Sequence, residues 1–242
     1  MAKEKTESAA VATAERARTV RARTNTPTKP APHGAPAKAT QRDFGQVVSD
    51  EVIERTAQAM EANGFHTIVV ETAADARKAL LDMIPEGAEV HSASSRTLEA
   101  IDVIGEIQES GRYSSVKART YKMDRATQMD EIRKLTSSPQ YMLGSVHAVT
   151  EEGEVIIASG SGSQVAPYVY GASKVIWVIG AQKIVHNLEE GMRRTREHVV
   201  PREAARLGVP LENYRKLPNV VIYNFERPGR ITAIIVKESL GY

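Results

Sequence analysis

The sequence predicts an α/β fold with a mostly parallel sheet, flanked by helices and accompanied by antiparallel hairpins. Strand-like and helix-like segments alternate along most of the chain, which is the pattern of parallel strands joined by crossover helices. The run 175–179 is apolar on both faces, as a central parallel strand requires. Two further apolar runs flank Glu151-Glu152-Gly153, which predicts a hairpin because glycine accepts the positive φ of a tight turn.

The first part of the predicted domain has clear helix boundaries. Helical periodicity covers residues 44–63, and the Asn-Gly pair at its end predicts a stop. Residues 66–70 form the next expected strand. Thr72 and Asp75 then predict a second helix, because a hydroxyl and a carboxylate at this spacing can cap each other's backbone amides.

The middle of the chain continues the alternation. A short strand is expected at residues 89–92, followed by one helix that begins within 93–97 and continues through Ile107. A strand at 117–122 and a helix at 126–136 complete this part. They lead into the central stretch that contains the hairpin.

The last part of the chain is expected to begin with a surface helix and to end with a hairpin. Asn187 and Glu190 predict the helix start by the same capping logic, and the segment that follows is heavily charged. Residues 210–218 are expected to form a loop. Strands at 220–225 and 231–236 are joined by Arg-Pro-Gly-Arg, whose Pro-Gly centre suits a type II turn.

The composition excludes several kinds of site. The 242 residues include no Cys, so the chain has no disulfide, no cysteine nucleophile and no Cys-ligated zinc or iron–sulfur cluster. His66, His147 and His186 do not share metal-ligand spacing, and we expect neither metal nor cofactor. No apolar run approaches the roughly 18 residues of a membrane span, so a cytoplasmic protein without membrane contact is expected.

The charge of the chain is divided between a tail and a domain. Residues 1–42 carry nine Lys or Arg and three Asp or Glu, a charge of +6, whereas the remainder carries 23 and 27, a charge of −4. Because residues 1–40 contain no Leu, Ile, Phe, Trp or Tyr, we expect 1–43 to be a disordered basic tail and 44–242 to be one domain. The tail is either simply solvated or weakly attracted to polyanions, so nucleic-acid binding is expected of the tail alone.

Several separated segments resemble the LUD-domain family, the lactate-utilization proteins of the LutC type, and in particular its stand-alone members. The segments are Ser-Val-His-Ala-Val-Thr-Glu-Glu-Gly-Glu-Val-Ile-Ile-Ala-Ser at 145–159, the Gly/Ser-rich run after it, Lys-Val-Ile-Trp-Val-Ile-Gly-Ala-Gln-Lys-Ile-Val at 174–185, and Arg-Pro-Gly-Arg-Ile-Thr at 227–232. The resemblance covers residues 44–242. It implies the fold shared by ribose-phosphate isomerase, glucosamine-phosphate deaminase and the CoA transferases, the NagB/RpiA/CoA-transferase-like fold.

The resemblance also implies a role in oxidising L-lactate to pyruvate together with iron–sulfur partner proteins. Because this chain has no Cys, such partners would carry the electrons. The expected ligand is a small anionic metabolite. The alternative is a non-catalytic accessory or ligand-binding subunit of a redox assembly, so the sequence leaves open whether the protein is an enzyme. A homo-oligomer is compatible with either function.

Glu151 is the candidate catalytic residue. The turn Thr150-Glu151-Glu152-Gly153 resembles the hairpin of the family and the Ser-Glu-Asn-Gly turn of related CoA transferases, although Glu152 replaces Asn. A carboxylate at this place can act as a general base or nucleophile, and burial would raise its pKa. The alternative is a polar turn with no catalytic role.

Anion binding is expected at three further places, each beside the end of a predicted strand. A Gly/Ser loop can offer backbone amides, although a plain connector is the alternative; its residues are Ser159, Gly160, Ser161, Gly162, Ser163 and Gln164. Ser94 and Thr97 can donate hydrogen bonds, and Arg96 can pair with an anion, unless they only cap a helix. Lys183 follows the strand 175–179 and is either a ligand-binding or a surface lysine.

These candidates are expected to converge. In a parallel sheet, ligands bind at the carboxyl ends of the strands, so Glu151 and the Gly/Ser loop should address opposite ends of one substrate. His147 lies on an apolar strand and is expected to be a hydrogen-bonded core histidine more than a base.

Overall fold

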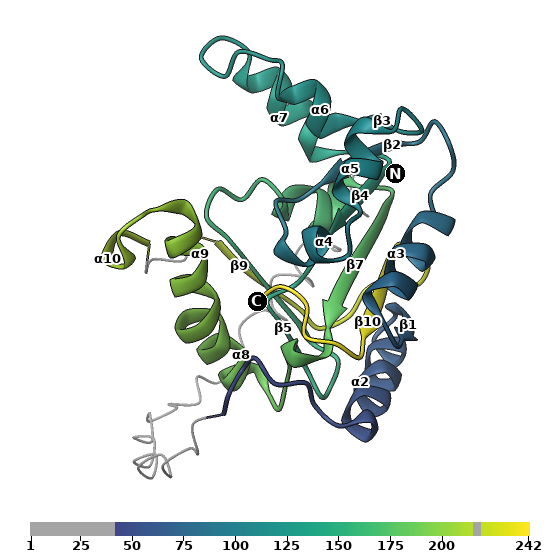
Figure 1. Ribbon diagram of the computed structural model, residues 1–242, viewed down its shortest axis with the longest axis vertical. Coiled ribbons are helices and arrows are strands. Elements are labelled where there is room, and N and C mark those ends of the chain that lie inside the picture. Colours follow the sequence, from purple (N-terminus) through teal and green to yellow (C-terminus); the bar gives the residue numbers. More distant parts are fainter. Residues whose placement is uncertain (1–41, 215–218) are drawn as a thin grey trace, which may run out of the picture. The chain divides into compact units, whose positions relative to one another are not determined.

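The computed structural model describes residues 42–214 and 219–242 (Figure 1). The predicted tail, residues 1–43, lies outside these residues except for its last two. The helices are α2 (Asp50–Ala62), α3 (Ala73–Asp82), α4 (Arg96–Ala100), α5 (Ile104–Glu109), α6 (Val116–Thr120), α7 (Met129–Ser137), η1 (Pro167–Gly171), η2 (Ala181–Lys183), α8 (Leu188–Arg194), η3 (Thr195–Val199), α9 (Val200–Leu207) and α10 (Leu211–Tyr214).

The strands form two sheets. Their bounds are β1 (His66–Val70), β2 (Glu89–Ser92), β3 (Ser114–Ser115), β4 (Tyr141–Gly144), β5 (Ala148–Thr150), β6 (Val155–Ser159), β7 (Lys174–Gly180), β8 (Ile184–Val185), β9 (Asn219–Tyr223) and β10 (Ile231–Val236). The first sheet has the order β1-β10-β7-β4-β2-β3, and all of its pairs are parallel. The second has the order β8-β5-β6-β9, in which β6 is antiparallel to both neighbours. The predicted α/β fold with a parallel sheet is confirmed.

The two sheets stack face to face between helices. Trp177 and Ile179 of β7 pack with Val155 and Ile157 of β6 and with α2 in one core. The other face of the first sheet, including Ile176, packs against α3, α4 and α5. The outer face of the second sheet is covered by α8. Strand β7 is therefore buried on both faces, as its continuous apolar sequence predicts.

Local capping rules account for the helix starts. The Thr72 side chain accepts a hydrogen bond from the Asp75 amide, and the Asp75 carboxylate accepts one from the Thr72 amide, so the predicted capping box is confirmed. Asn187 caps α8 through a 3.0 Å hydrogen bond from the Glu190 amide. These contacts involve neighbours in the sequence, which is why the sequence alone reveals them.

Two predictions about the middle of the chain were wrong. Residues 117–122 were expected to form a strand, but they lie mostly in helix α6, because Ser115 caps it by accepting from the Ala118 amide at 3.2 Å. The single helix expected from 93–97 through Ile107 is two helices. The chain between them passes through Asp102 at φ +52°, which ends the first helical run.

Three predictions about the last part were also wrong. Residues 210–218 were expected to form a loop, but they contain helix α10 (Leu211–Tyr214). Strands β9 and β10 do not form a hairpin, because β9 pairs with β6 in the second sheet while β10 lies between β1 and β7 in the first. Helix α8 is not a surface helix throughout. Gly191 lets it approach the second sheet so closely that a Cβ there would lie 2.4 Å from Ile156 Cδ1, and Arg194 is fully buried.

Candidate functional site

A cleft of about 920 Å³ lies at the carboxyl ends of β2, β4 and β7. Its floor is formed by residues that end or follow these strands, among them His91, Ser145 and Lys183. One wall comes from α6 and α7, and the other from the Gly/Ser loop, α9 and α10. Figure 1 shows α6 and α7 at the top and α9 and α10 at the left, with the sheet edge between them. The volume is within the range of small-molecule sites.

Lys183 lies at the floor of this cleft with a side chain that is only 2% exposed. Its Nζ atom donates hydrogen bonds to Thr97 Oγ1 at 2.8 Å, Ser145 Oγ at 3.0 Å and the Val146 carbonyl oxygen at 3.3 Å. All three oxygens are neutral. The amine therefore links the start of α4 to the segment that follows β4. No carboxylate is among its hydrogen-bond partners.

Both hydroxyl groups around Lys183 are fixed by a second hydrogen bond. Thr97 donates to the Leu240 carbonyl oxygen at 3.2 Å, and Ser145 donates to the Val178 carbonyl oxygen at 2.6 Å. Each hydroxyl hydrogen is thereby occupied, and each oxygen faces the amine as an acceptor. The surroundings of Nζ are rigid because every partner is attached to the core.

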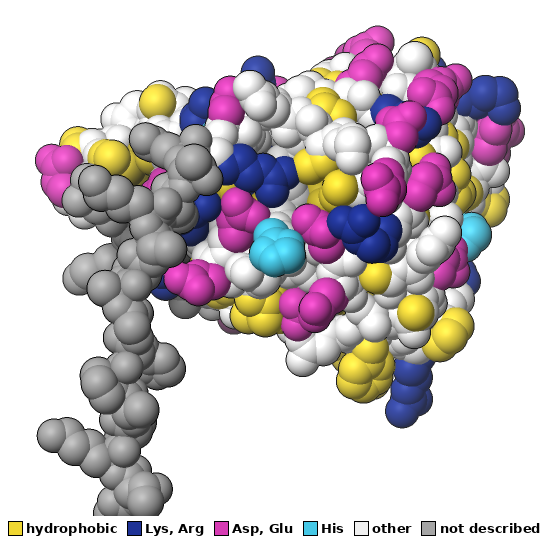
Figure 2. All heavy atoms as spheres, turned by 90° about the horizontal axis from the view of Figure 1, so that it is seen from below, with side chains coloured by type: hydrophobic (Ala, Val, Ile, Leu, Met, Phe, Trp, Pro, Cys, Tyr) yellow, Lys and Arg dark blue, Asp and Glu magenta, His cyan; other side chains and the backbone are white. Residues whose placement is uncertain are grey.

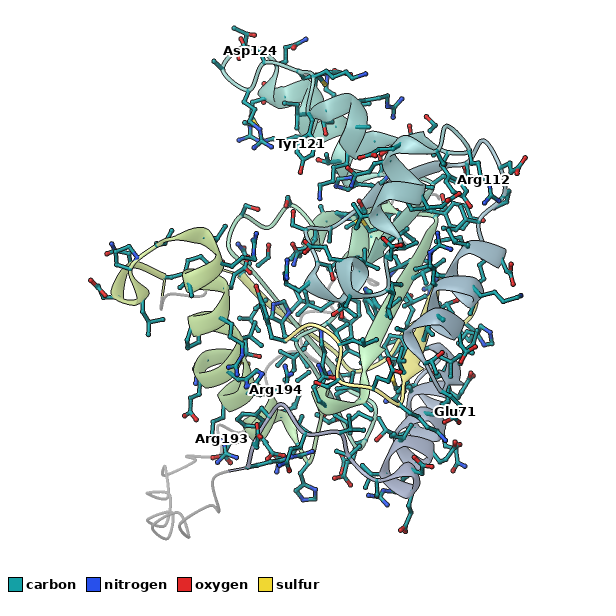
Figure 3. All side chains as sticks on the ribbon, in the orientation of Figure 1. Glu71, Arg112, Tyr121, Asp124, Arg193 and Arg194 are labelled. Atoms are coloured by element: carbon teal, nitrogen blue, oxygen red, sulfur yellow. The ribbon has the colours of Figure 1, made fainter. Side chains whose placement is uncertain are left out.

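Burial, and secondly the charge of Arg194, hold the pKa of Lys183 well below its usual 10.5. Figure 3 shows Arg194 on α8, on the inner side of the helix facing the sheets. Its guanidinium donates to the His147 carbonyl oxygen. A lysine with this environment exchanges its proton closer to neutral pH, which suits it for base or nucleophile chemistry.

Two histidines line the same cleft in their neutral forms. Burial, and secondly the charge of Lys117, lower the pKa of His91 to about 4. His91 Nδ1 is buried and has no hydrogen-bond partner among the described residues. Burial and the charges of Lys183 and Arg194 lower the pKa of His147 to about 3. His147 Nδ1 accepts from the Ala158 amide at 3.1 Å, so its proton is on Nε2.

The cleft is positively charged along one wall. Lys117, Arg125 and Arg133 line it from α6, α7 and the segment between them, and we refer to these three residues as the basic wall. Lys117 Nζ donates to Ser94 Oγ at 3.3 Å. Among the described residues that line the cleft, Glu203 is the one carboxylate, and it is bonded to Arg206 and to the hydroxyl of Tyr242. Arg133 also pairs with Asp130 at 3.0 Å, so the excess of positive charge that an entering anion meets comes from Lys117 and Arg125.

The Gly/Ser loop lines the opposite side, and part of its hydrogen-bonding capacity is used internally. Ser159 Oγ accepts from the Gly162 amide at 2.9 Å, and Ser161 Oγ accepts from the Ser163 amide at 3.4 Å. Gln164 donates to the Ala158 carbonyl oxygen at 3.2 Å. These internal hydrogen bonds hold the loop, and all six of its residues line the cleft.

The structure places the predicted hairpin elsewhere. Glu151 accepts a hydrogen bond from Arg55 of α2 and lies 3.5 Å from His186 Nδ1, and it is not among the residues that line the cleft. Burial opposes its ionisation, but the hydrogen bond and charges of Arg55 and His186 outweigh this and hold the pKa of Glu151 below its usual value. The predicted rise of this pKa was wrong because sequence does not reveal the ion pair.

The neighbours of Glu151 hold the turn in place. Thr150 Oγ1 accepts from the Glu154 amide at 3.0 Å, within the hairpin. Gly153 has φ +81°, and a Cβ there would lie 2.7 Å from the Ala59 carbonyl carbon of α2. Thr150 and Gly153 therefore stabilise the conformation of this hairpin. The catalytic role of Glu151 stays a prediction.

The cleft brings together most of the predicted ligand-binding residues and adds others. Ser94, Arg96, Thr97, the whole Gly/Ser loop and Lys183 all line it, whereas Thr150, Glu151 and Gly153 do not. Sequence reasoning missed Ser145, His91 and the basic wall. Ser145 directly follows β4, so identifying the end of that strand would have found it.

The described residues contain no group of three or more His, Asp or Glu placed to hold a metal ion. Within the same part of the chain, no helix combines the length and apolar character needed to cross a membrane. The face in Figure 2 carries acidic and basic side chains in mixture, and no large patch of one sign is visible on it.

Comparisons with known proteins identify one family. The sequence model of the LUD domain matches residues 53–238. Among solved structures, the crystal structure of a DUF162 family protein from Deinococcus radiodurans is similar, with a TM-score of 0.49 and 12% sequence identity, over 77% of this chain and 96% of that one. A search of curated proteins gave no significant match.

Proposed function

Because the chain belongs to the LUD-domain family, we propose that it functions in lactate utilization in the cytoplasm and binds a short 2-hydroxy or 2-oxo acid in the cleft. L-Lactate and pyruvate are the ligands of this class that the family name suggests. The observation that carries the proposal is the charge of the cleft, in which Lys117 and Arg125 line it together with a single carboxylate that is already bonded. Arg96 and Arg133 line it as well, but they are paired with Glu99 and Asp130.

The arrangement of polar groups suits an acid with a second oxygen beside the carboxylate. The basic wall can hold the carboxylate, because charge-assisted hydrogen bonds are the stronger ones in such sites. Deeper in the cleft, His91 has a buried nitrogen that needs a partner, and Lys183 presents an amine. A hydroxyl or carbonyl oxygen at C2 of the acid would meet these groups.

Oxidation of a 2-hydroxy acid releases electrons that need an acceptor. Because this chain has no Cys, it cannot ligate an iron–sulfur cluster through thiolates to accept them. The proposal therefore includes iron–sulfur partner proteins as electron acceptors. The part assigned to this chain is to bind the acid, orient C2 and hold or transfer a proton there.

Calorimetric titration of the full chain with L-lactate, pyruvate and lactamide tests the proposal. Lactamide keeps the shape of lactate but has no charge, so we expect it not to bind. Lys117→Met should weaken binding of both acids about tenfold or more, the loss of one hydrogen bond to a charged group. The matched control is Lys122→Met, an exposed lysine beside α6 that does not line the cleft. Equal binding of lactate and lactamide, or no binding of either acid, would contradict the proposal.

A second candidate is a non-catalytic subunit of a redox assembly. Tyr170 is 90% exposed and Phe225 is 74% exposed, and aromatic side chains of this kind are enriched where proteins bind one another. This function predicts that an iron–sulfur partner binds the chain while the acids do not bind in calorimetry. Tyr170→Ser and Phe225→Ser should then weaken the partner complex.

A further inference from the structure

We propose that Lys183 forms a covalent imine with the C2 carbonyl group of a short 2-oxo acid bound in the cleft. The inference rests on the proposed function for the entry of such an acid, and it adds a chemical step at a named atom. It assigns the amine as a catalytic residue, in the sense that Nζ bonds to the reacting carbon.

The first support is the position of the amine. Lys183 ends the short helical turn η2 that follows β7, so it lies at the carboxyl end of the central strand of the parallel sheet. Open α/β sheets bind their ligands at this edge. The side chain lines the floor of the cleft although it is only 2% exposed, so a small acid can reach the amine from one direction.

The second support is the set of hydrogen-bond partners. Lys237, for comparison, pairs with two carboxylates, Asp50 at 3.2 Å and Glu71 at 2.8 Å. Lys183 instead has three neutral oxygens, and a buried ammonium group without a carboxylate costs free energy. The site thus favours the uncharged amine.

The third support is what the uncharged amine can do in this geometry. A neutral amine has two N–H groups, which serve the nearer oxygens of Thr97 at 2.8 Å and Ser145 at 3.0 Å. The longer contact to the Val146 carbonyl oxygen at 3.3 Å is then given up, and the nitrogen carries a lone pair. The lowered pKa of Lys183 makes this form accessible at a lower pH than for an exposed lysine. An uncharged lysine at the floor of a cleft is the nucleophile that carbonyl substrates require.

The reaction balances without another reactant. The Nζ lone pair attacks C2, the C=O π electrons move to oxygen, and one amine proton transfers to that oxygen to give a carbinolamine. Loss of hydroxide with a further proton, together one water molecule, then forms the C=N bond. Ser145 and Thr97 position the amine through their hydrogen bonds, and the basic wall holds the carboxylate of the acid.

Borohydride reduction of the full chain with pyruvate tests the inference directly. Borohydride converts an imine to a stable secondary amine, so the intact mass should rise by one carboxyethyl group and peptide mapping should place the group on Lys183. L-Lactate has a hydroxyl group at C2 in place of the ketone and should give no adduct. This measurement uses the unaltered chain, so it does not depend on whether any variant folds.

Variants then separate chemistry from binding. Lys183→Arg keeps hydrogen-bond donors at this position but cannot form an imine, and it should lose the adduct completely. Lys117→Met leaves the Lys183 amine in place, so the adduct should still form at saturating pyruvate. Half-maximal adduct formation should need about tenfold more pyruvate than in the wild type. Lys174→Met, at an exposed lysine that does not line the cleft, should leave the adduct unchanged.

The outcomes distinguish this inference from the proposed function. If pyruvate binds in calorimetry but no adduct forms, the imine is refuted and the binding function stands. If the adduct is spread over exposed lysines, or persists in Lys183→Arg, the imine at this residue is likewise refuted. If pyruvate neither binds nor reacts, both fail.

Discussion

Replacing Lys183 by Met separates two opposing contributions of this buried amine to stability. The first is the loss of the hydrogen bonds that the neutral amine donates, to Thr97 Oγ1 at 2.8 Å and Ser145 Oγ at 3.0 Å. The two hydroxyl groups keep the bonds that they donate to backbone carbonyls, so they are not left without partners. The net loss in the Met variant is therefore about 1–3 kcal/mol, the cost of removing a buried hydrogen-bond donor.

The second contribution depends on pH. Because the pKa of Lys183 is lower in the folded than in the unfolded protein, the unfolded state binds more protons between the folded pKa and 10.5. The stability of the wild type therefore rises with pH in that window, by up to about 1.4 kcal/mol per unit, and is lost as pH falls towards the folded pKa. A Met side chain has no such dependence.

Together these contributions predict a reversal. Above pH 10.5 the Met variant should be less stable than the wild type, and this difference in the free energy of unfolding should shrink as the pH falls. It should change sign about one to two pH units below 10.5, where the protonation cost equals the hydrogen-bond loss. At neutral pH, Lys183→Met should then be the more stable protein.

Urea unfolding at a series of pH values, followed by the fluorescence of Trp177, measures this difference. Trp177 is the single Trp of the chain and is fully buried. Lys174→Met at an exposed lysine is the control, and its difference from the wild type should not vary with pH. A difference for Lys183→Met that is equally constant from pH ~7 to above 10.5 would refute the reasoning, because it would mean that folding does not perturb this amine.

Three further predictions concern the hairpin and the tail. Glu151→Gln should cost less than about 1 kcal/mol in urea unfolding and leave pyruvate binding unchanged, because it removes one partly exposed ion pair away from the cleft; loss of turnover in this variant would instead support the catalytic role. Gly153→Ala should destabilise the protein by about 2 kcal/mol or more, because both the positive φ and the contact with Ala59 oppose a Cβ. The control Gly87→Ala has a similar φ but open space around it, and it should cost about 1 kcal/mol. Equal losses of stability in the two variants would contradict the packing argument. Deleting residues 2–40 should shift the melting temperature by less than about 2 °C, and a drop of about 5 °C would show ordered docking of the tail.

The parts of the fold that follow from local chemistry were predictable. The apolar run of β7 identifies a strand buried on both faces, and the caps at Thr72 and Asn187 identify helix starts. The structure of the segment 117–122 was not predictable. A short stretch of mixed polar and apolar residues fits either a strand or a helix until the Ser115 cap is seen. Length and periodicity decide such cases only for longer elements.

The parts that depend on pairing between distant segments were not predictable. The sequence shows that β9 and β10 are strands, but it does not show that they belong to different sheets. The same limit affected the site. The hairpin at Glu151 was expected beside the cleft on the assumption of one sheet, whereas it belongs to the second sheet and packs against α2. Lys183 was placed correctly at the strand end, but its burial depends on Thr97 and Ser145, which are distant in sequence.

The position of β10 has a consequence for the order in which the protein folds during synthesis. Strand β1 is among the first described elements to be made, yet its one neighbour in the sheet is β10, the last strand of the chain. Until the ribosome has passed through the intervening residues, β1 has no strand to pair with, although β7, β4 and β2 can already pair with one another. Insertion of β10 between β1 and β7 then completes the sheet in a late step with high loop-closure entropy. Nascent chains arrested before residue 231 should therefore have a protease-sensitive β1 and a protected β7.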